Sequence, residues 1–138
     1  MDHTNATKPW NTEGTTKREA VRSMFAAIAP KYDRLNGVMS FSKHHEWRAV
    51  AVRMLGLKQG DTAMDVCCGT GDFMVPLFNQ VGPDGRVFGV DFCLPMLKEA
   101  QQKLNTQRIS LGDACRLPVR DHAFDAVSVG WGIRNVPD

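Results

Sequence analysis

The sequence predicts a single α/β domain built around a mostly parallel sheet. From residue 62 onward, short apolar runs bounded by turn residues alternate with helical segments, which is the pattern of βαβ units. A glycine turn at 69–71 joins the first of these runs to a helix, as expected at the edge of a parallel sheet. The chain has 138 residues, 43% of them hydrophobic, which is enough for one domain with its own core.

The part of the chain before the predicted sheet falls into two segments. Residues 1–16 are rich in Thr, Asn and Gly and are expected to form a flexible tail. In the following segment, apolar residues at helical spacing predict helices over 17–29 and 43–55. Pro30 is expected to end the first helix, and the stretch between the two helices is expected to be a loop or a short helix.

The remaining residues, 58–138, are expected to carry the sheet. Their apolar periods and turn residues predict strands over 62–66, 86–91, 108–113 and 124–132, and helices over 69–80 and 95–104. Pro76 falls within the first turns of its helix, where a missing N–H group is tolerated.

The stretch DVCCGTGD at 65–72 raises the question of a metal or redox site. Cys67 and Cys68 are adjacent, so they are expected to point to opposite faces and do not match the C-x-x-C spacing of zinc or redox pairs. The four histidines also lack an i, i+4 pair. We therefore expect no metal site, and we interpret the cysteines as half-buried thiols at the end of a strand.

The glycines of the same stretch point to a nucleotide-like ligand. Gly69, Thr70 and Gly71 lie between a predicted strand and a helix, where backbone N–H groups face a ligand and no Cβ blocks its approach. Asp91 follows Gly71 by 20 residues, at the end of the next strand, where a carboxylate can accept both hydroxyls of a ribose. Because the third position of a dinucleotide fingerprint is Met74, and no G-K-[ST] follows, the pattern indicates adenosine rather than a P-loop.

Asp65 adds a more specific pattern to this turn. With Gly69 and Gly71 it forms D-x-x-x-G-x-G, which resembles motif I of the class I S-adenosylmethionine-dependent methyltransferases. The resemblance implies S-adenosyl-L-methionine as cofactor and a Rossmann-like three-layer sandwich, here incomplete with about four parallel strands. Acidic residues beside the turn suit a cationic sulfonium. Asp113, after the third strand, stands where such enzymes contact the adenine amine, although by itself it reads equally well as a turn aspartate.

A second segment narrows the resemblance. YDRLNGVMSFSKHHEW at 32–47 resembles the signature of the ubiquinone/menaquinone biosynthesis C-methyltransferases (the UbiE/MenG family), and GIRNV at 132–136 resembles the segment after the fourth strand of that family. The resemblance implies that 17–57 form a lid or substrate segment and that 58–138 form the cofactor-binding portion. The signature positions are Tyr32, Asp33, Asn36, Ser40, His44 and Trp47.

The family implies methyl transfer to a ring carbon of a prenylated quinol, from demethylmenaquinol to menaquinol or in the equivalent ubiquinone step. Gly130 stands where family members often have a serine, so Ser128, on the same strand face, is the replacement candidate. The candidate cofactor-binding residues are Asp65, Gly69, Thr70, Gly71, Asp91, Asp113, Ala114 and Ser128.

The acceptor side of the site has four candidate catalytic residues, which are Tyr32, His44, Arg134 and Asn135. Arg134 is expected to stabilise the developing phenolate rather than to act as a base, because its pKa is too high. His44 is a candidate base or proton relay, and a purely structural hydrogen-bonding role is the alternative.

Composition excludes several other classes of function. The net charge of +2 and the scattered basic residues argue against nucleic acid as a partner. No stretch approaches 18 consecutive apolar residues, and the polar N-terminus does not resemble a secretory signal. The four cysteines are then expected to be reduced thiols of a cytoplasmic protein. A prenylated substrate implies peripheral contact with a membrane surface.

Class I methyltransferases continue beyond a fourth strand, so the resemblance leads us to expect a C-terminally truncated chain. The strand over 124–132 would then be an apolar, uncharged edge, and we expect a homodimer or higher assembly through it. Two alternatives to a quinol methyltransferase stay open. One is a cofactor-binding fragment or assembly module without activity, and the other, which the missing third glycine disfavours, is a nicotinamide oxidoreductase.

Overall fold

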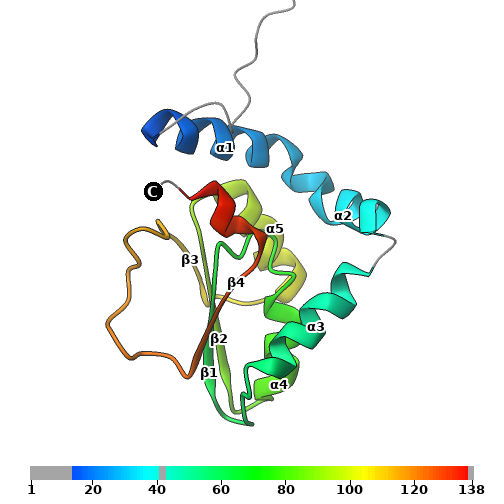
Figure 1. The fold of residues 1–138 in the computed structure, drawn as a ribbon, viewed down its shortest axis with the longest axis vertical. Helices are drawn as coiled ribbons and strands as arrows, with labels where there is room; N and C mark the ends of the chain where they lie inside the picture. Colours follow the sequence, from blue (N-terminus) through cyan, green and yellow to red (C-terminus); the bar gives the residue numbers. More distant parts are fainter. Residues whose placement is uncertain (1–13, 41–42, 137–138) are drawn as a thin grey trace, which may run out of the picture.

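The computed structural model describes residues 14–40 and 43–136, and it confirms the predicted alternation of strands and helices (Figure 1). The helices are α1 (Gly14–Ile28), α2 (Tyr32–Ser40), α3 (His44–Met54), α4 (Met74–Val81) and α5 (Leu94–Leu104), with 3-10 helices η2 (Ala29–Lys31) and η3 (Trp131–Asn135). The strands are β1 (Thr62–Val66), β2 (Arg86–Asp91), β3 (Ile109–Leu111) and β4 (Ala126–Val129).

The four strands form one parallel sheet in the order β3-β2-β1-β4. β1 pairs with both β2 and β4, so the first predicted strand lies inside the sheet. β1 and β2 coincide with their predicted ranges, whereas β3 and β4 are shorter than predicted. The last residues of the predicted fourth strand instead form η3, which folds back over the carboxyl ends of the strands (Figure 1).

The N-terminal segment is more helical than predicted. α1 already begins at Gly14, inside the expected tail, and residues 1–13 of that tail lie outside the described residues. α1 ends at Ile28, just before Pro30, as predicted, and Pro30 occupies the first turn of η2, where a residue without an N–H group loses no hydrogen bond. The stretch that follows is the two-turn helix α2.

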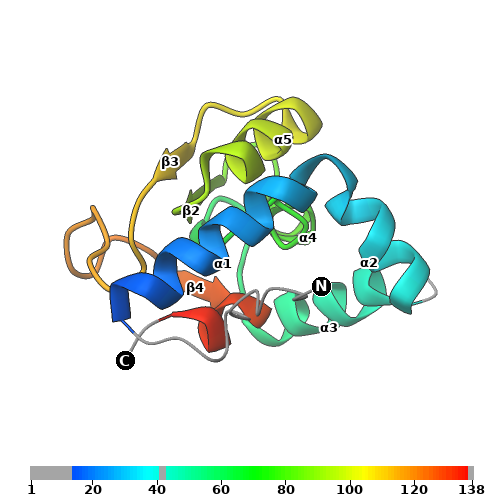
Figure 2. The same cartoon turned by 90° about the horizontal axis from the view of Figure 1, so that it is seen from above.

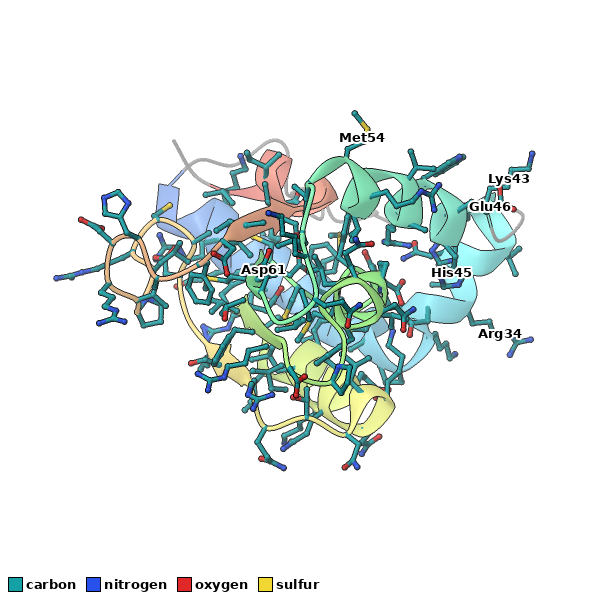
Figure 3. The ribbon with its side chains drawn as sticks, turned by 90° about the horizontal axis from the view of Figure 1, so that it is seen from below. Arg34, Lys43, His45, Glu46, Met54 and Asp61 are labelled. Atoms are coloured by element: carbon teal, nitrogen blue, oxygen red, sulfur yellow. The ribbon has the colours of Figure 1, made fainter. Side chains whose placement is uncertain are left out.

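The two faces of the sheet are covered differently. α4 and α5 pack on one face, and α3 packs on α4, around a core of fully buried side chains that includes Met74, Leu77 and Val87. On the other face, Met64 is covered by side chains of the connection between β3 and β4, including Phe124. Figure 3 shows Met54 of α3 and Arg34 of α2 pointing outward, away from the sheet.

α1 lies across the carboxyl ends of the strands, where it contacts α5 and η3 (Figure 2). Its buried Val21 faces the rest of the domain. This placement puts a helical cover over the edge of the sheet where open α/β folds bind ligands. Within the described part of the chain, no helix has the length and apolar character that a bilayer crossing requires.

Candidate functional site

A cavity of about 310 Å³ lies under α1 at the carboxyl ends of the strands. Its floor comes from the turn after β1, the end of β2 and the segment after β3. Its cover comes from α1, α2 and η3. The polar and glycine lining includes Arg18, Tyr32, Asn36, Arg48, Asp65, Gly69, Thr70, Asp72, Asp91, Asp113 and Asn135. The apolar lining includes Met24, Phe25, Ile28, Phe73, Phe92 and Met96.

The glycine turn after β1 has a backbone that L side chains rarely adopt. Gly69 has a φ of +54° and Gly71 a φ of +86°. Gly69 lines the cavity, whereas Gly71 is not among the lining residues. A Cβ at position 71 would lie 2.6 Å from Cδ1 of Leu104, so this glycine lets α5 approach the turn closely.

Asp91 is buried at the end of β2 and faces the cavity. Its Oδ2 accepts the N–H of Gly69 at 2.9 Å, and its Oδ1 accepts the N–H of Cys93 at 2.8 Å. Burial raises the pKa of Asp91 more than these backbone hydrogen bonds lower it. Each carboxylate oxygen has a second lone pair, so Asp91 is held in place and can still accept two hydroxyl groups.

Asp65 and Ser128 face each other across β1 and β4. Ser128 Oγ donates to Asp65 Oδ1 at 2.7 Å. Asp65 lines the cavity and Ser128 does not. The serine therefore orients a carboxyl group of the cavity without lining the cavity itself. Burial raises the pKa of Asp65 to about 7, which leaves this group poised between its charged and neutral forms near neutral pH.

The segment after β3 contributes Asp113 and Ala114, two of the candidate cofactor-binding residues, to the cavity. Asp113 Oδ1 accepts the N–H of Cys115 at 2.9 Å, which is the hydrogen bond of a turn aspartate. Its Oδ2 lies 3.1 Å from a guanidinium nitrogen of Arg18, so an ion pair joins α1 to the floor of the cavity. Asp113 is thus a turn aspartate that also lines the cavity, and its contact with an adenine amine stays a prediction.

Of the four candidate catalytic residues, the structure places two in the lining of the cavity. Tyr32 and Asn135 line the cavity, and the ring of Tyr32 meets Phe25 edge to face at 5.9 Å. Arg134 belongs to η3, and its side chain lies outside what the structure describes. His44 is buried but is not among the lining residues.

The surroundings of His44 explain its position. Arg48, one helical turn later, donates to Nδ1 of His44. Burial, followed by the neighbouring charges of His45 and Arg48, lowers the pKa of His44, so the ring is neutral at neutral pH. These contacts match the structural alternative, in which the histidine is part of the support of the site.

Sequence reasoning missed three charged residues of the cavity, Arg18, Arg48 and Asp72. Oδ2 of Asp72 lies 3.5 Å from a guanidinium nitrogen of Arg48, and Oδ1 accepts a hydrogen bond from Lys103 at 2.6 Å. Burial acts to raise the pKa of Asp72, but Lys103, Arg48 and His44 together lower it. The available signals were the i, i+4 spacing of His44 and Arg48 and the position of Asp72 directly after the glycine turn.

The cysteines beside the turn are free thiols. Cys67 packs with the core on one face of the sheet and Cys68 with the core on the other, as their adjacency predicts. Burial raises the pKa of Cys67 to about 11 and that of Cys68 still further, so both stay protonated. Among residues 14–40 and 43–136, no three His, Cys, Asp or Glu side chains are grouped in a way that could hold a metal ion.

The sequence matches one protein family over almost its full length. The profile of the ubiE/COQ5 methyltransferase family covers residues 13–138. The chain belongs to this family. It is 45% identical over 128 residues to the demethylmenaquinone methyltransferase of Bacillus cytotoxicus, with 89% of this chain and 54% of that protein aligned. The resemblance inferred from the 32–47 and 65–72 segments is thereby confirmed.

Two further relatives have the same description. The demethylmenaquinone methyltransferase of Geobacillus stearothermophilus is 43% identical, with 89% of this chain and 55% of that protein aligned. The corresponding protein of Staphylococcus aureus is 42% identical, with 91% and 54% aligned. The chain thus spans about half the length of the curated relatives it matches.

Solved structures confirm the predicted class I methyltransferase fold. A putative S-adenosyl-L-methionine-dependent methyltransferase from Methanococcus maripaludis superposes with a TM-score of 0.65 at 18% identity, over 79% of this chain and 51% of that one. An S-adenosylmethionine-dependent methyltransferase from Aquifex aeolicus gives 0.57 at 23% identity, over 66% and 51%.

Proposed function

We propose that this chain is the cofactor-binding part of an enzyme that methylates a ring carbon of a prenylated quinol, with S-adenosyl-L-methionine as the methyl donor. The observation that carries the proposal is Asp91. Its carboxylate is held by the Gly69 N–H at the carboxyl edge of the sheet, inside a cavity, in a chain whose relatives are demethylmenaquinone methyltransferases. These relatives are named demethylmenaquinone methyltransferases, which supports demethylmenaquinol as the acceptor.

The cavity fits the chemical groups of this cofactor. Asp91 would accept the ribose hydroxyls, and Asp113 with Ala114 would border the adenine. Asp65 offers a carboxylate to the cationic amino-acid tail, and the buried guanidinium of Arg48 offers donors to its carboxylate. When bound, the cofactor supplies a methyl group that is already activated for transfer.

The residues of the chain then have three tasks. They align the acceptor ring with the methyl group, which can lower the barrier by on the order of 7–11 kcal/mol. The apolar side chains of α1, Phe25 and Ile28 among them, exclude water from the reacting groups. Asn135 of η3, and Arg134 beside it in sequence, are proposed to stabilise the phenolate that forms as the quinol hydroxyl loses its proton.

His44 is a weaker candidate for the base that takes this proton. Its ring is buried beside Arg48, and it is not among the residues that line the cavity. Tyr32, which does line the cavity, is better placed to relay a proton. A His44→Ala enzyme with unchanged turnover per folded molecule would remove this histidine from the chemistry.

The cellular setting is part of the same proposal. We expect a cytoplasmic enzyme that touches the membrane surface through its prenylated substrate. We also expect self-association through β4, which is an edge strand of the described sheet and exposes Val127 and Val129. Light scattering tests the association. A Val127→Lys variant should shift the chain toward monomer, and a wild-type chain that is already monomeric would contradict it.

The first experiment is a calorimetric titration of this chain with S-adenosylhomocysteine. Asp91→Ala should abolish binding, whereas Asp84→Ala, at an exposed turn position, removes the same charge and should bind as the wild type does. Binding of NADH in preference to S-adenosylhomocysteine would instead favour an oxidoreductase. A methyl-transfer assay with demethylmenaquinol then separates an enzyme from a module that only binds the cofactor.

A further inference from the structure

Lys103 lies outside the cavity, yet it joins the two sides of it. Its Nζ donates to Asp33 Oδ2 at 2.6 Å and to Asp72 Oδ1 at 2.6 Å, and it lies 3.4 Å from Thr70 Oγ1. Thr70 Oγ1 in turn donates to Asp33 Oδ1. We call these four residues the Lys103 cluster. An ammonium group has three donors, and here all three have an acceptor.

The cluster connects three separate elements. Lys103 comes from α5, Asp33 from α2, and Thr70 and Asp72 flank Gly71 in the turn after β1. Both residues from the turn line the cavity, and neither Asp33 nor Lys103 does. The cation therefore holds α2 against the outer side of the turn whose inner side faces the ligand.

The Lys103 cluster is buried on the side of the turn and partly exposed on the side of α2. Asp72 and Thr70 are almost fully buried, whereas the side chains of Lys103 and Asp33 are 30% and 42% exposed. Without the cation, the carboxylates of Asp33 and Asp72 would face each other at short range, and the buried one would lose its hydrogen bond. Arg48 lies 3.5 Å from the other carboxylate oxygen of Asp72, Oδ2.

The contact with Asp33 also determines where α2 presents its cavity residues. Tyr32 and Asn36 line the cavity, and they stand one residue before and three residues after Asp33 on the same helix. Tyr32 and Asn36 are four residues apart and share a helix face, so a movement of the helix at Asp33 moves both lining residues. Tyr32 also packs beside Phe25 of α1.

We propose that Lys103 is a positioning residue: it holds α2 on the glycine turn and thereby sets the wall of the cavity that the N-terminal helices form. The contact itself needs no ligand. Its effect on cofactor affinity rests on the proposed function.

Hydrogen exchange of the ligand-free chain tests the contact directly. Lys103→Met should speed amide exchange in α2 by roughly tenfold, because a partly buried ion pair is broken, while amides of β1 and β2 stay protected. Lys98→Met removes an exposed cation from the same helix and should change neither region. Unchanged exchange in α2, or equal acceleration in α2 and the sheet, would overturn the proposal.

Two further variants sharpen the result. Lys103→Arg keeps a cation with several donors and should restore most of the protection of α2. Asp33→Asn combined with Lys103→Met should cost no more protection than Lys103→Met alone, since both changes break one unit. Fully additive effects would contradict the assignment of these residues to one contact.

A titration with S-adenosylhomocysteine tests whether the Lys103 contact sets the wall of the cavity. Lys103→Met should weaken S-adenosylhomocysteine binding by roughly tenfold at unchanged stoichiometry, as expected when the bound arrangement of α2 is less populated. Normal affinity together with loosened α2 would overturn the claim that the contact sets the cavity. A wild-type chain that binds no S-adenosylhomocysteine would contradict the proposed function, and the exchange experiment would still decide the contact.

Discussion

The two walls of the cavity are held by different kinds of interaction. On the sheet side, Asp91 is fixed by backbone N–H groups of the same βαβ unit, and Asp65 is fixed by Ser128 of the neighbouring strand. On the helical side, apolar packing of Phe25 and Tyr32 around the buried Met96 attaches α1 and α2, and the ion pairs of Arg18 and Lys103 add to it. The difference shows that the sheet can preorganise its carboxylates through hydrogen bonds, whereas the helical wall combines apolar packing with a few charges that can be changed one at a time.

The largest expected effect lies in the core beneath the sheet wall. Leu77 of α4 is completely buried, so Leu77→Ala should lower the free energy of unfolding by about 2–5 kcal/mol. Val75 on the same helix is 42% exposed, and Val75→Ala should change it by less than about 1 kcal/mol. Urea denaturation measures both, and similar losses would contradict the distinction between the two sides of α4.

A second prediction concerns Gly132, where η3 packs against Cys67 of the turn after β1. A Cβ at Gly132 would lie 2.5 Å from Cβ of Cys67, an atom that cannot rotate away. Gly132→Ala should therefore cost about 1–3 kcal/mol of stability and weaken S-adenosylhomocysteine binding, because η3 must move. Ile133→Ala, at a position 64% exposed in the same element, is the control. Unchanged binding by the Gly132 variant would show that η3 is not a fixed part of the wall.

The ionisation of Asp65 predicts a pH dependence of the sheet side. Because burial raises its pKa from 3.8 to about 7, the folded state binds more protons than the unfolded state between these values. Stability should therefore fall as pH rises through this window and level off above it. In the Asp65→Asn variant, the free energy of unfolding should differ less between pH 5 and pH 8 than in the wild type, by about 1–3 kcal/mol. Thermal unfolding at the two pH values measures this. An identical pH profile in the variant would count against this assignment.

The smallest effect is expected at the other ion pair of the helical wall. Arg18 and Asp113 are 41% and 36% exposed, so Arg18→Ala should cost less than about 1 kcal/mol. The loss should shrink further in high salt. The melting temperatures of the wild type and the variant, compared at low and high salt, measure this loss of stability. A large, salt-independent loss would mean that packing of the arginine stem, rather than charge, attaches α1.

Local sequence patterns predicted the sheet wall well. The change from helical to strand period located β1 and β2 at their observed bounds, and the glycine turn with Asp91 at the next strand end located the sheet side of the cavity. The family signature located Tyr32 on the helical side. The lengths of β3 and β4 were overestimated, because short apolar stretches such as Gly130–Gly132 fit a strand or a 3-10 turn equally well.

What the sequence by itself determined is therefore the order of the elements, the glycine turn and the carboxylates at the strand ends, since each follows from residues close together in the chain. Only the tertiary structure decided that Gly71 makes room for α5, that Ser128 orients Asp65, and that Lys103 meets Asp33 across 70 residues. The physical reason is that a side-chain pairing depends on where whole helices come to rest. Packing of the core sets that position, and no local period records it.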